Sequence, residues 1–328
     1  MTSYVNVSSI QDFMSCRFRW WCKWVMNRVQ KDEAPALAGG KLLHRIFEDA
    51  GRGNVTLHEA AEIAIRDWKQ SMSSASERDR LSGEKALKII EDLGEGLALW
   101  EDKYPFEFPV LEIEEPFEIE FPDLPNVFFR GRPDRVGILN NQIWHVQNRG
   151  LAAGTNFGIY IATAKRHYHE HLYAEHLAWK WGLGLPDGFT MPDGEHFPKG
   201  FKYGGTMFNL VRKLKYRTKV TKANPAGETK TKDELFFQHP MSINLKSGLH
   251  KHVMFSMFQH VRAMQQVQKE WEEDQIIPAP NERLNAGPFG NMVDPFFRVL
   301  TGEITLEDNE VFKDREDTYA PQDALTVD

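Results

Sequence analysis

Three polar residues near the middle of the chain have the types and the spacing that could form a metal-dependent catalytic site. Asp134 lies on a first predicted strand, and Gln147 and Arg149 lie two residues apart near the end of a second. The stretch 129–150 is rich in β-branched and aromatic residues on either side of Asn140-Asn141, a pair that tolerates the positive φ angles of a tight turn. The pattern predicts a β-hairpin that brings the three polar side chains together.

Oxygen atoms that a hairpin brings together can bind a hard cation such as Mg²⁺. Asp134 offers a carboxylate, and Gln147 offers a neutral amide oxygen, which is a weaker ligand. Next to a scissile phosphate, a divalent ion polarises the phosphoryl oxygen and promotes the ionisation of water. Arg149 can stabilise negative charge there, but it stays protonated and cannot act as a base. The alternative is an ordinary surface hairpin with a single acidic residue.

The sequence Pro133-Asp134, followed on the next strand by Gln-x-Arg, resembles the signature of the PD-(D/E)XK nuclease superfamily. In that signature an Asp and an Asp/Glu-x-Lys lie on adjacent strands of one hairpin. Here Gln147 and Arg149 stand where the superfamily has the second carboxylate and the lysine. The resemblance implies an α/β fold with a restriction-endonuclease-like core, in which a mixed sheet is flanked by helices. It also implies that Asp134, Gln147 and Arg149 are catalytic residues.

An upstream element carries the resemblance further. After Gly39-Gly40, which we expect to form the loop at a helix start, Leu43, Ile46 and Phe47 form an apolar helical face. The segment resembles the Gly-x-x-x-His-x-x-x-Glu element of RecB-type nucleases and of the exonuclease-like enzymes of CRISPR adaptation. This likeness implies that His44 is a metal ligand together with Asp134 and Gln147. Imidazole is unusual for Mg²⁺ but suits Mn²⁺, so the expected cofactor is Mg²⁺ or Mn²⁺.

Two further segments extend the likeness or compete with it. We expect one long helix over residues 160–181, in which His169 and Tyr173 occupy the positions of the RecB-type Gln-x-x-x-Tyr element. The resemblance implies that both face the site and the DNA. His167 and His171 on the same helix are four residues apart, a spacing that can also bind zinc, although no third ligand suggests itself.

The strand expected over residues 110–121 holds Glu114 and Glu115. Either could reach the site from a neighbouring strand, although alternating Glu is also typical of the solvent-facing side of an edge strand.

The N-terminal segment bears on a possible iron–sulfur cluster. A helix is expected to begin at Ser8 or Ser9, which are good N-cap residues, and its sequence resembles the entry helix of RecB-type nucleases. Some of those enzymes bind an iron–sulfur cluster through a cysteine at the position of Cys16 and three C-terminal cysteines. This chain has only Cys16 and Cys22, so four thiolates from one chain cannot hold a cluster. We expect Cys16 to be a small buried residue and the protein to have no iron–sulfur cluster.

Charge is distributed unevenly along the chain. The net charge is −7, so DNA binding would need a local basic surface. Lys and Arg dominate residues 199–232, a predicted basic loop whose candidate phosphate contacts are Arg212, Lys213, Lys215 and Arg217. Acidic residues dominate 301–328, which is expected to be a solvated tail, or alternatively a flexible tail that competes with phosphate for the basic loop.

Composition sets the outer limits. The chain has 328 residues, of which 41% are hydrophobic and 27% are charged, as in ordinary globular proteins. We expect one nuclease-like domain over residues 1–300, with a helical insertion at about 55–103. No apolar run is long enough to cross a membrane, and two cysteines do not make a disulfide framework, so a cytoplasmic protein is expected.

The favoured hypothesis is an exonuclease-like, metal-dependent DNA nuclease that acts on single strands or duplex ends in DNA processing or recombination. A protein partner in a DNA-processing complex is a further expectation. The rival hypothesis is an inactive nuclease fold that serves as a DNA-binding or partner-binding module. Loss of both the second carboxylate and the lysine is what a decaying site would show.

Overall fold

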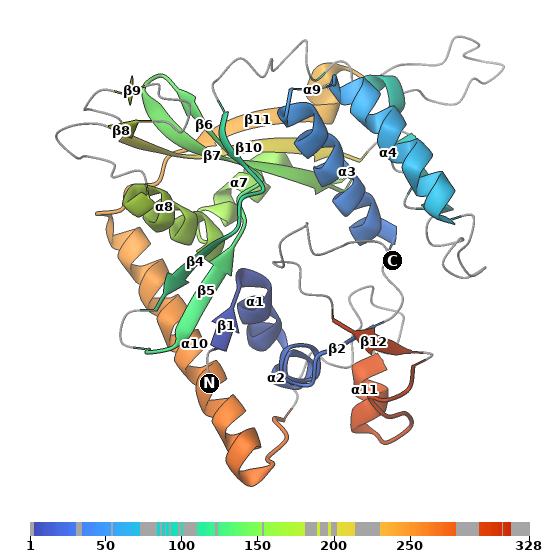
Figure 1. Ribbon diagram of the computed structural model, residues 1–328, viewed down its shortest axis with the longest axis vertical. Helices are drawn as coiled ribbons and strands as arrows, with labels where there is room; N and C mark the ends of the chain where they lie inside the picture. Colours follow the sequence, from blue (N-terminus) through green and yellow to red (C-terminus); the bar gives the residue numbers. More distant parts are fainter. Residues whose placement is uncertain are drawn as a thin grey trace. The chain divides into compact units, whose positions relative to one another are not determined.

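The structure is a computed structural model of the chain (Figure 1). It describes residues 3–30, 35–53, 55–72, 84–85, 87–88, 90–91, 93–97, 100, 110–121, 124–152, 154–180, 189–190, 196–197, 202–213, 230–279, 295–309 and 311–315. The chain divides into two compact units, each assembled from separate segments. The first unit comprises 1–32, 116–132 and 251–328, and the second unit comprises 33–115 and 133–250.

The second unit contains a mixed sheet with helices on both faces. Its elements are α3 (Pro35–Gly51), α4 (Leu57–Met72), η2 (Gly94–Leu97), β3 (Val110–Ile113), β6 (Arg135–Leu139), β7 (Gln142–Leu151), α7 (Phe157–Ala164), α8 (Tyr168–Lys180), β8 (Phe189–Thr190), β9 (His196–Phe197), β10 (Lys202–Arg212), α9 (Lys232–Leu235) and β11 (Phe236–Met241). Five strands pair in the order β11-β10-β7-β6-β3. β10 runs parallel to β7, and the other neighbours are antiparallel. This arrangement confirms the predicted α/β class.

Alternation along the strands determines which helices cover each face. Val211 of β10 packs in one cluster with α3 and α4, whereas its neighbour Leu210 packs in another cluster with Ile161 of α7. Successive strand residues point to opposite faces, so α3 and α4 cover one face of the sheet and α7 covers the other. Leu177 of α8 packs on Val136 of β6 in a third cluster. Figure 1 shows these helices around the sheet.

The predicted hairpin turn is present. Asn140 and Asn141 have φ angles of 53° and 57°, and Leu139 pairs with Gln142 on either side of them. Two consecutive positive φ angles define a type I′ turn, which suits the right-handed twist of a hairpin. The turn fixes the register between β6 and β7.

Two predicted strands are each divided in the structure. The strand expected over 110–121 is divided into β3 and β4 (Phe117–Glu120), and the first hairpin strand is divided into β5 (Val127–Gly131) and β6. β4 and β5 belong to the first unit, and β3 and β6 to the second. The chain crosses between units at Pro116 and Pro133, where a proline restricts the preceding residue and has no N–H for a ladder.

Two helix predictions also need correction. Gly39 and Gly40 lie inside α3, which begins at Pro35, a residue well suited to the first turn of a helix. The helix expected over 160–181 is two helices, α7 and α8, separated by residues 165–167. His171 Nε2 hydrogen-bonds to the Lys165 carbonyl oxygen at 3.0 Å, and its Nδ1 lies 2.9 Å from His250 Nδ1, so His250 is a histidine partner of His171.

The first unit has a smaller sheet and several helices. Its remaining elements are β1 (Ser3–Val5), α1 (Val7–Ser15), α2 (Arg17–Trp20), the π-helical turn η1 (Trp21–Val25), β2 (Arg28–Gln30), α11 (Pro295–Leu300) and β12 (Phe312–Asp314), and α10 (Gly248–Asp274) starts in the second unit. Strands pair in the order β1-β5-β4, and β12 pairs with β2. The predicted acidic tail is therefore folded at Phe312–Asp314, while residues 316–328 lie outside the described part.

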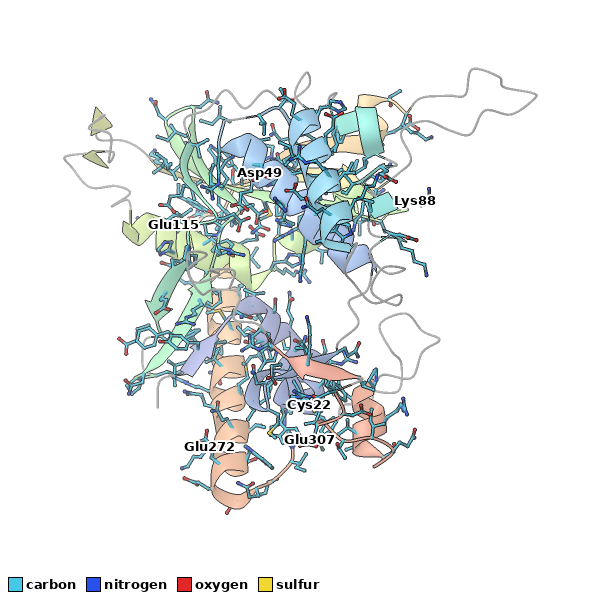
Figure 2. All side chains as sticks on the ribbon, turned by 45° about the vertical axis from the view of Figure 1, so that its right-hand side comes forward. Cys22, Asp49, Lys88, Glu115, Glu272 and Glu307 are labelled. Carbon is cyan, nitrogen blue, oxygen red and sulfur yellow. The ribbon has the colours of Figure 1, made fainter. Side chains whose placement is uncertain are left out.

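The N-terminal predictions fall within the first unit. The N-cap of α1 is Asn6, not Ser8 or Ser9, and Ser9 completes the capping box three residues later. Cys16 is buried and caps α2, because its Sγ accepts from the backbone N–H of Arg19. Cys22, labelled in Figure 2, is buried in η1. Among the described helices, none has the length and apolar character to cross a membrane.

Candidate metal centre

His44, Glu114 and Asp134 form a cluster at the edge of the second unit's sheet. One ligand atom from each residue lies within 4.8 Å of the other two. His44 Nδ1 lies 3.4 Å from Asp134 Oδ2. Two ligands of one ion, each about 2.1 Å from it, lie at most about 4.2 Å apart, so small side-chain rotations would bring all three ligand atoms onto one ion. We call these three residues the carboxylate–imidazole cluster.

Glu114 joins the cluster because the chain bends sharply after β3. Its φ angle is 51°, a left-handed conformation that is uncommon for residues other than glycine or asparagine. Its backbone N–H donates to the carbonyl oxygen of Asp134 at 3.2 Å, which extends the pairing of β3 with β6 by one residue. Of the two alternatives for this segment, Glu114 therefore follows the first, because it reaches the cluster from the end of a neighbouring strand. Figure 2 labels Glu115, the next residue.

His44 is presented by the polar side of α3. Its neighbours Leu43, Ile46 and Phe47 are buried in the cluster shared with α4. His44 itself is half-buried and faces Asp134. Asp49, labelled in Figure 2, lies on the same helix and pairs with Arg45 instead. A buried apolar face thus fixes the rotation of α3 and directs a single imidazole at the cluster.

Asp134 is held by the backbone of β7. The N–H of Asn148 donates to Asp134 Oδ2 at 2.6 Å, and Asp134 is buried. Asn148 is fixed in turn, because Asn209 Nδ2 of β10 donates to its Oδ1 at 2.9 Å, and Gln238 of β11 donates to Asn209. This row of amides crosses three strands and orients the carboxylate.

Gln147 and Arg149 lie on the strand beside Asp134. Arg135 pairs with Val146, and the same register continued by one residue sets Asp134 opposite Gln147. Arg149 Nη2 donates to Gln147 Oε1, so the amide oxygen expected to bind metal already accepts from a guanidinium. That role for Gln147 stays a prediction.

The Arg149 guanidinium lies among acidic groups. Burial alone lowers the pKa of Arg149, but the charges of Asp134 and Glu170 and its hydroxyl contact with Tyr160 outweigh burial and raise the pKa above its ordinary value. Burial likewise lowers the pKa of Arg135 to about 10, against the opposing effect of Asp134. Both arginines are cations at neutral pH, so Arg149 brings a fixed positive charge to the site.

Tyr173 of α8 packs against His145 of β7. It is buried, and its ring meets the His145 ring edge to face with 4.3 Å between centroids. His169 lies in α8 on the same helix, but its side chain is outside the described part of the chain. The predicted catalytic and DNA-facing roles of these two residues stay predictions.

The predicted basic loop is partly a strand. Arg212 ends β10 and donates to the carbonyl oxygens of Glu234 and Thr155, at 3.2 and 3.0 Å, with its guanidinium over the Phe157 ring. These contacts join segments of the fold. Lys215 and Arg217 lie outside the described residues.

Lys213 follows β10 and lies against α3. A Cβ atom at Gly150 would come within 2.9 Å of Lys213 Cε and 3.1 Å of Leu43 Cδ2, so this glycine leaves the space that the lysine stem fills. Burial lowers the pKa of Lys213. Lys213 is therefore a part-buried cation of the second unit rather than a fully solvated one.

Four residues that contact Arg149 or Gln147, directly or through one neighbour, did not emerge from the sequence: His145, Tyr160, Glu170 and Thr206. The available signal was a polar residue at 145 inside an apolar strand, two positions before Gln147 and therefore on the same face. The four histidines in and beside α8 drew attention away from Glu170, whose burial no sequence pattern indicated.

Comparison with known proteins relates part of this arrangement to a known family. Residues 4–146 match the family model described as PD-(D/E)XK nuclease superfamily. The match spans α3, the bend at Glu114 and the hairpin up to Val146. A search of curated proteins found no significant match.

Proposed function

We propose that the chain, whose residues 4–146 match the PD-(D/E)XK nuclease superfamily model, is a metal-dependent DNA nuclease that hydrolyses phosphodiester bonds. The observation that carries the proposal is the carboxylate–imidazole cluster, because it supplies the second carboxylate that the hairpin lacks. Glu114 and Asp134 together provide the two negative charges that the family signature provides with its two acidic residues. The carboxylate of Glu114 thereby replaces the negative charge that is missing at Gln147.

The donor set of the cluster fits a divalent ion. Two carboxylates and one imidazole suit Mn²⁺ well, and the carboxylates alone suit Mg²⁺. When bound, such an ion supplies positive charge to the scissile phosphate and favours the deprotonation of water. His44, Glu114 and Asp134 would hold it, and Gln147 is the further candidate ligand.

Arg149 has a separate role in this proposal. Its guanidinium lies close enough to Asp134 for their charges to interact, and in this proposal it contacts a phosphate oxygen next to the cluster. Negative charge that develops on the phosphate is stabilised by a donor held in position beforehand. Since Arg149 stays protonated, it cannot deprotonate water, and a carboxylate or the His44 imidazole would have to accept the proton.

The substrate in this proposal is DNA, either a single strand or a duplex end. It is cut in an exonuclease-like manner during DNA processing or recombination. His169, Tyr173 and the basic residues would lie along the path of the bound strand. A protein partner in a DNA-processing complex is compatible with the acidic net charge. The second candidate is an inactive domain that binds DNA or a partner, and the replacement of lysine by Arg149 favours it. That candidate predicts metal binding without cleavage, or neither.

The test is a cleavage assay on end-labelled single-stranded and duplex DNA with Mn²⁺, Mg²⁺ or EDTA. Wild type should cleave with Mn²⁺, and Asp134→Ala should lose about 10²-fold or more of that activity. Asp49→Ala is the matched control, since it removes a carboxylate from the helix of His44 without touching the cluster. A wild type that is inert on every substrate with both metals would favour the binding module instead.

A further inference from the structure

Three residues on one face of β7 form a continuous row of polar contacts. His145, Gln147 and Arg149 are spaced by two residues, so their side chains project to the same side of the strand. Arg149 Nη2 contacts Gln147 Oε1, and Gln147 Nε2 lies 3.2 Å from His145 Nε2. Behind them, His145 Nδ1 lies 3.7 Å from Glu170 Oε2 on α8. We call these four residues the β7 row.

The chemistry of the partners fixes the direction of each contact. A guanidinium has only donors, so the oxygen of the Gln147 amide must face Arg149 and its NH₂ group must face His145. That NH₂ group is a donor, so His145 Nε2 must accept and carry no proton. The proton of a neutral His145 then lies on Nδ1, which faces the carboxylate of Glu170. The tautomer follows from its neighbours on both sides.

Burial makes this row rigid. The side chains of His145 and Glu170 are fully buried, and Gln147 is 1% exposed. The Thr206 hydroxyl donates to the same Glu170 oxygen that faces His145, and the Tyr173 ring packs against the imidazole. Polar groups in such surroundings keep their partners, because an unmet donor or acceptor costs about 1–3 kcal/mol.

We propose that Gln147, His145 and Glu170 are positioning residues that hold the Arg149 guanidinium in one orientation toward the scissile phosphate. The proposal deepens the nuclease function and rests on it. An arginine side chain loses about 2 kcal/mol of rotamer entropy when it is immobilised. Two anchors, Gln147 and Tyr160, fix the guanidinium before substrate binds. In this account Gln147 and Arg149 are a matched pair and not the remains of a lost site.

The pairing also explains the residue type at position 147. A glutamate there could accept from Arg149 but could not donate to His145 Nε2, so the imidazole would have to move its proton to Nε2, which turns an unprotonated Nδ1 toward Glu170, or take up a second proton. A lysine at 149 would replace a planar group that can bind in two directions with a single ammonium. Restoring one half of the family signature therefore disrupts the row.

The first arm of the test reads the tautomer of His145 by ¹⁵N–¹H correlation NMR on histidine-labelled protein. His145→Asn identifies the resonances by their loss. Wild type is expected to carry its proton on Nδ1, with an unprotonated Nε2. Gln147→Met removes both amide contacts at similar side-chain length and should yield a mixture of tautomers. A wild-type proton on Nε2 would overturn the proposed direction of the row.

The second arm measures kcat and KM for cleavage of a labelled oligonucleotide with Mn²⁺. Gln147→Met and Glu170→Gln should lower kcat by about 10- to 100-fold with KM changed less, because a misplaced catalytic group costs about that much. Glu175→Gln on the same helix is the control, as its carboxylate contacts His250 and not the β7 row. Circular dichroism and thermal unfolding establish that each variant is folded.

The outcomes separate the two proposals. If wild type cleaves and binds Mn²⁺ but both variants keep kcat within about twofold of wild type, positioning is refuted and the nuclease function stands. If wild type neither binds Mn²⁺ nor cleaves, the nuclease function fails and the role of Arg149 at a phosphate fails with it, whichever tautomer is found. A fall in kcat together with the Nδ1 tautomer supports both.

Discussion

Glu114 adopts a conformation that should weaken the fold while serving the site. A left-handed residue other than glycine costs about 1–2 kcal/mol, and Glu114 has a φ angle of 51°. Glu114→Gly removes that cost. Glycine also makes the unfolded chain more flexible, which lowers the free energy of unfolding by about 0.5–1 kcal/mol. In EDTA we therefore expect the variant to be more stable than wild type by about 0.5–1 kcal/mol, a rise of about 1–3 °C in Tm.

Metal should reverse that order. An ion at 100 times its Kd stabilises the protein that binds it by about 2.7 kcal/mol. Wild type should gain this stability with Mn²⁺, and Glu114→Gly should gain much less because the cluster loses one of its two carboxylates. The assay is thermal unfolding of both proteins in EDTA and over a Mn²⁺ titration.

Gln275→Gly is the matched control. Gln275 has a φ angle of 56° at the end of α10 and is exposed, so its replacement should relieve the same backbone strain without altering the response to Mn²⁺. If Glu114→Gly is less stable than wild type in EDTA, the strain argument is refuted. If it gains as much stability from Mn²⁺ as wild type does, Glu114 is not a ligand.

Three further predictions concern the second unit. Arg212→Gln should lower the free energy of unfolding by about 2 kcal/mol or more and leave the salt dependence of DNA binding unchanged, because backbone carbonyls accept from its guanidinium. Denaturant titration measures the first effect, and fluorescence anisotropy measures the second. Gly205→Ala should lower the free energy of unfolding by about 3 kcal/mol, since a Cβ there would lie 2.1 Å from the Met241 carbonyl oxygen at a φ angle of +130°; a loss below about 1 kcal/mol would contradict this packing. Hydrogen bonds from Thr231, backbone first, and from Lys230 lower the pKa of Glu234 to about 2, so its stabilisation is complete above pH 4.5 and is lost as the pH falls toward 2. Glu234→Gln should flatten stability over that interval, and an unchanged acid profile would argue against the hydrogen bonds from Thr231 and Lys230.

Local patterns predicted much of the second unit correctly. The Asn140-Asn141 turn, strand β7 and the apolar face of helix α3 each have a short-range signal of turn residues, β-branched residues or helical periodicity. His44 and Asp134 were expected to meet, and they lie 3.4 Å apart. These features depend on a few neighbouring residues, so one sequence contains enough to predict them.

The boundaries between the units, the bend at Glu114 and the side-chain partners of Gln147 were harder to predict. Alternating apolar residues continue through Pro116 and Pro133, so the pattern alone did not reveal that the chain passes there from one unit to the other. The bend that directs Glu114 at Asp134 has no glycine to mark it. The amide of Gln147 could have served a metal or a neighbour, and only the structure shows that Arg149 and His145 occupy its two ends.

The central claim is that His44, Glu114 and Asp134 bind one divalent ion, and its most direct test is pulsed electron paramagnetic resonance of protein loaded with one equivalent of Mn²⁺. Electron spin-echo modulation detects a directly bound imidazole nitrogen. Wild type should show a single ¹⁴N coupling, and His44→Gln, which keeps both carboxylates, should bind Mn²⁺ more weakly and lose that coupling. A wild-type spectrum without ¹⁴N coupling, or a coupling that survives in His44→Gln, would contradict the account.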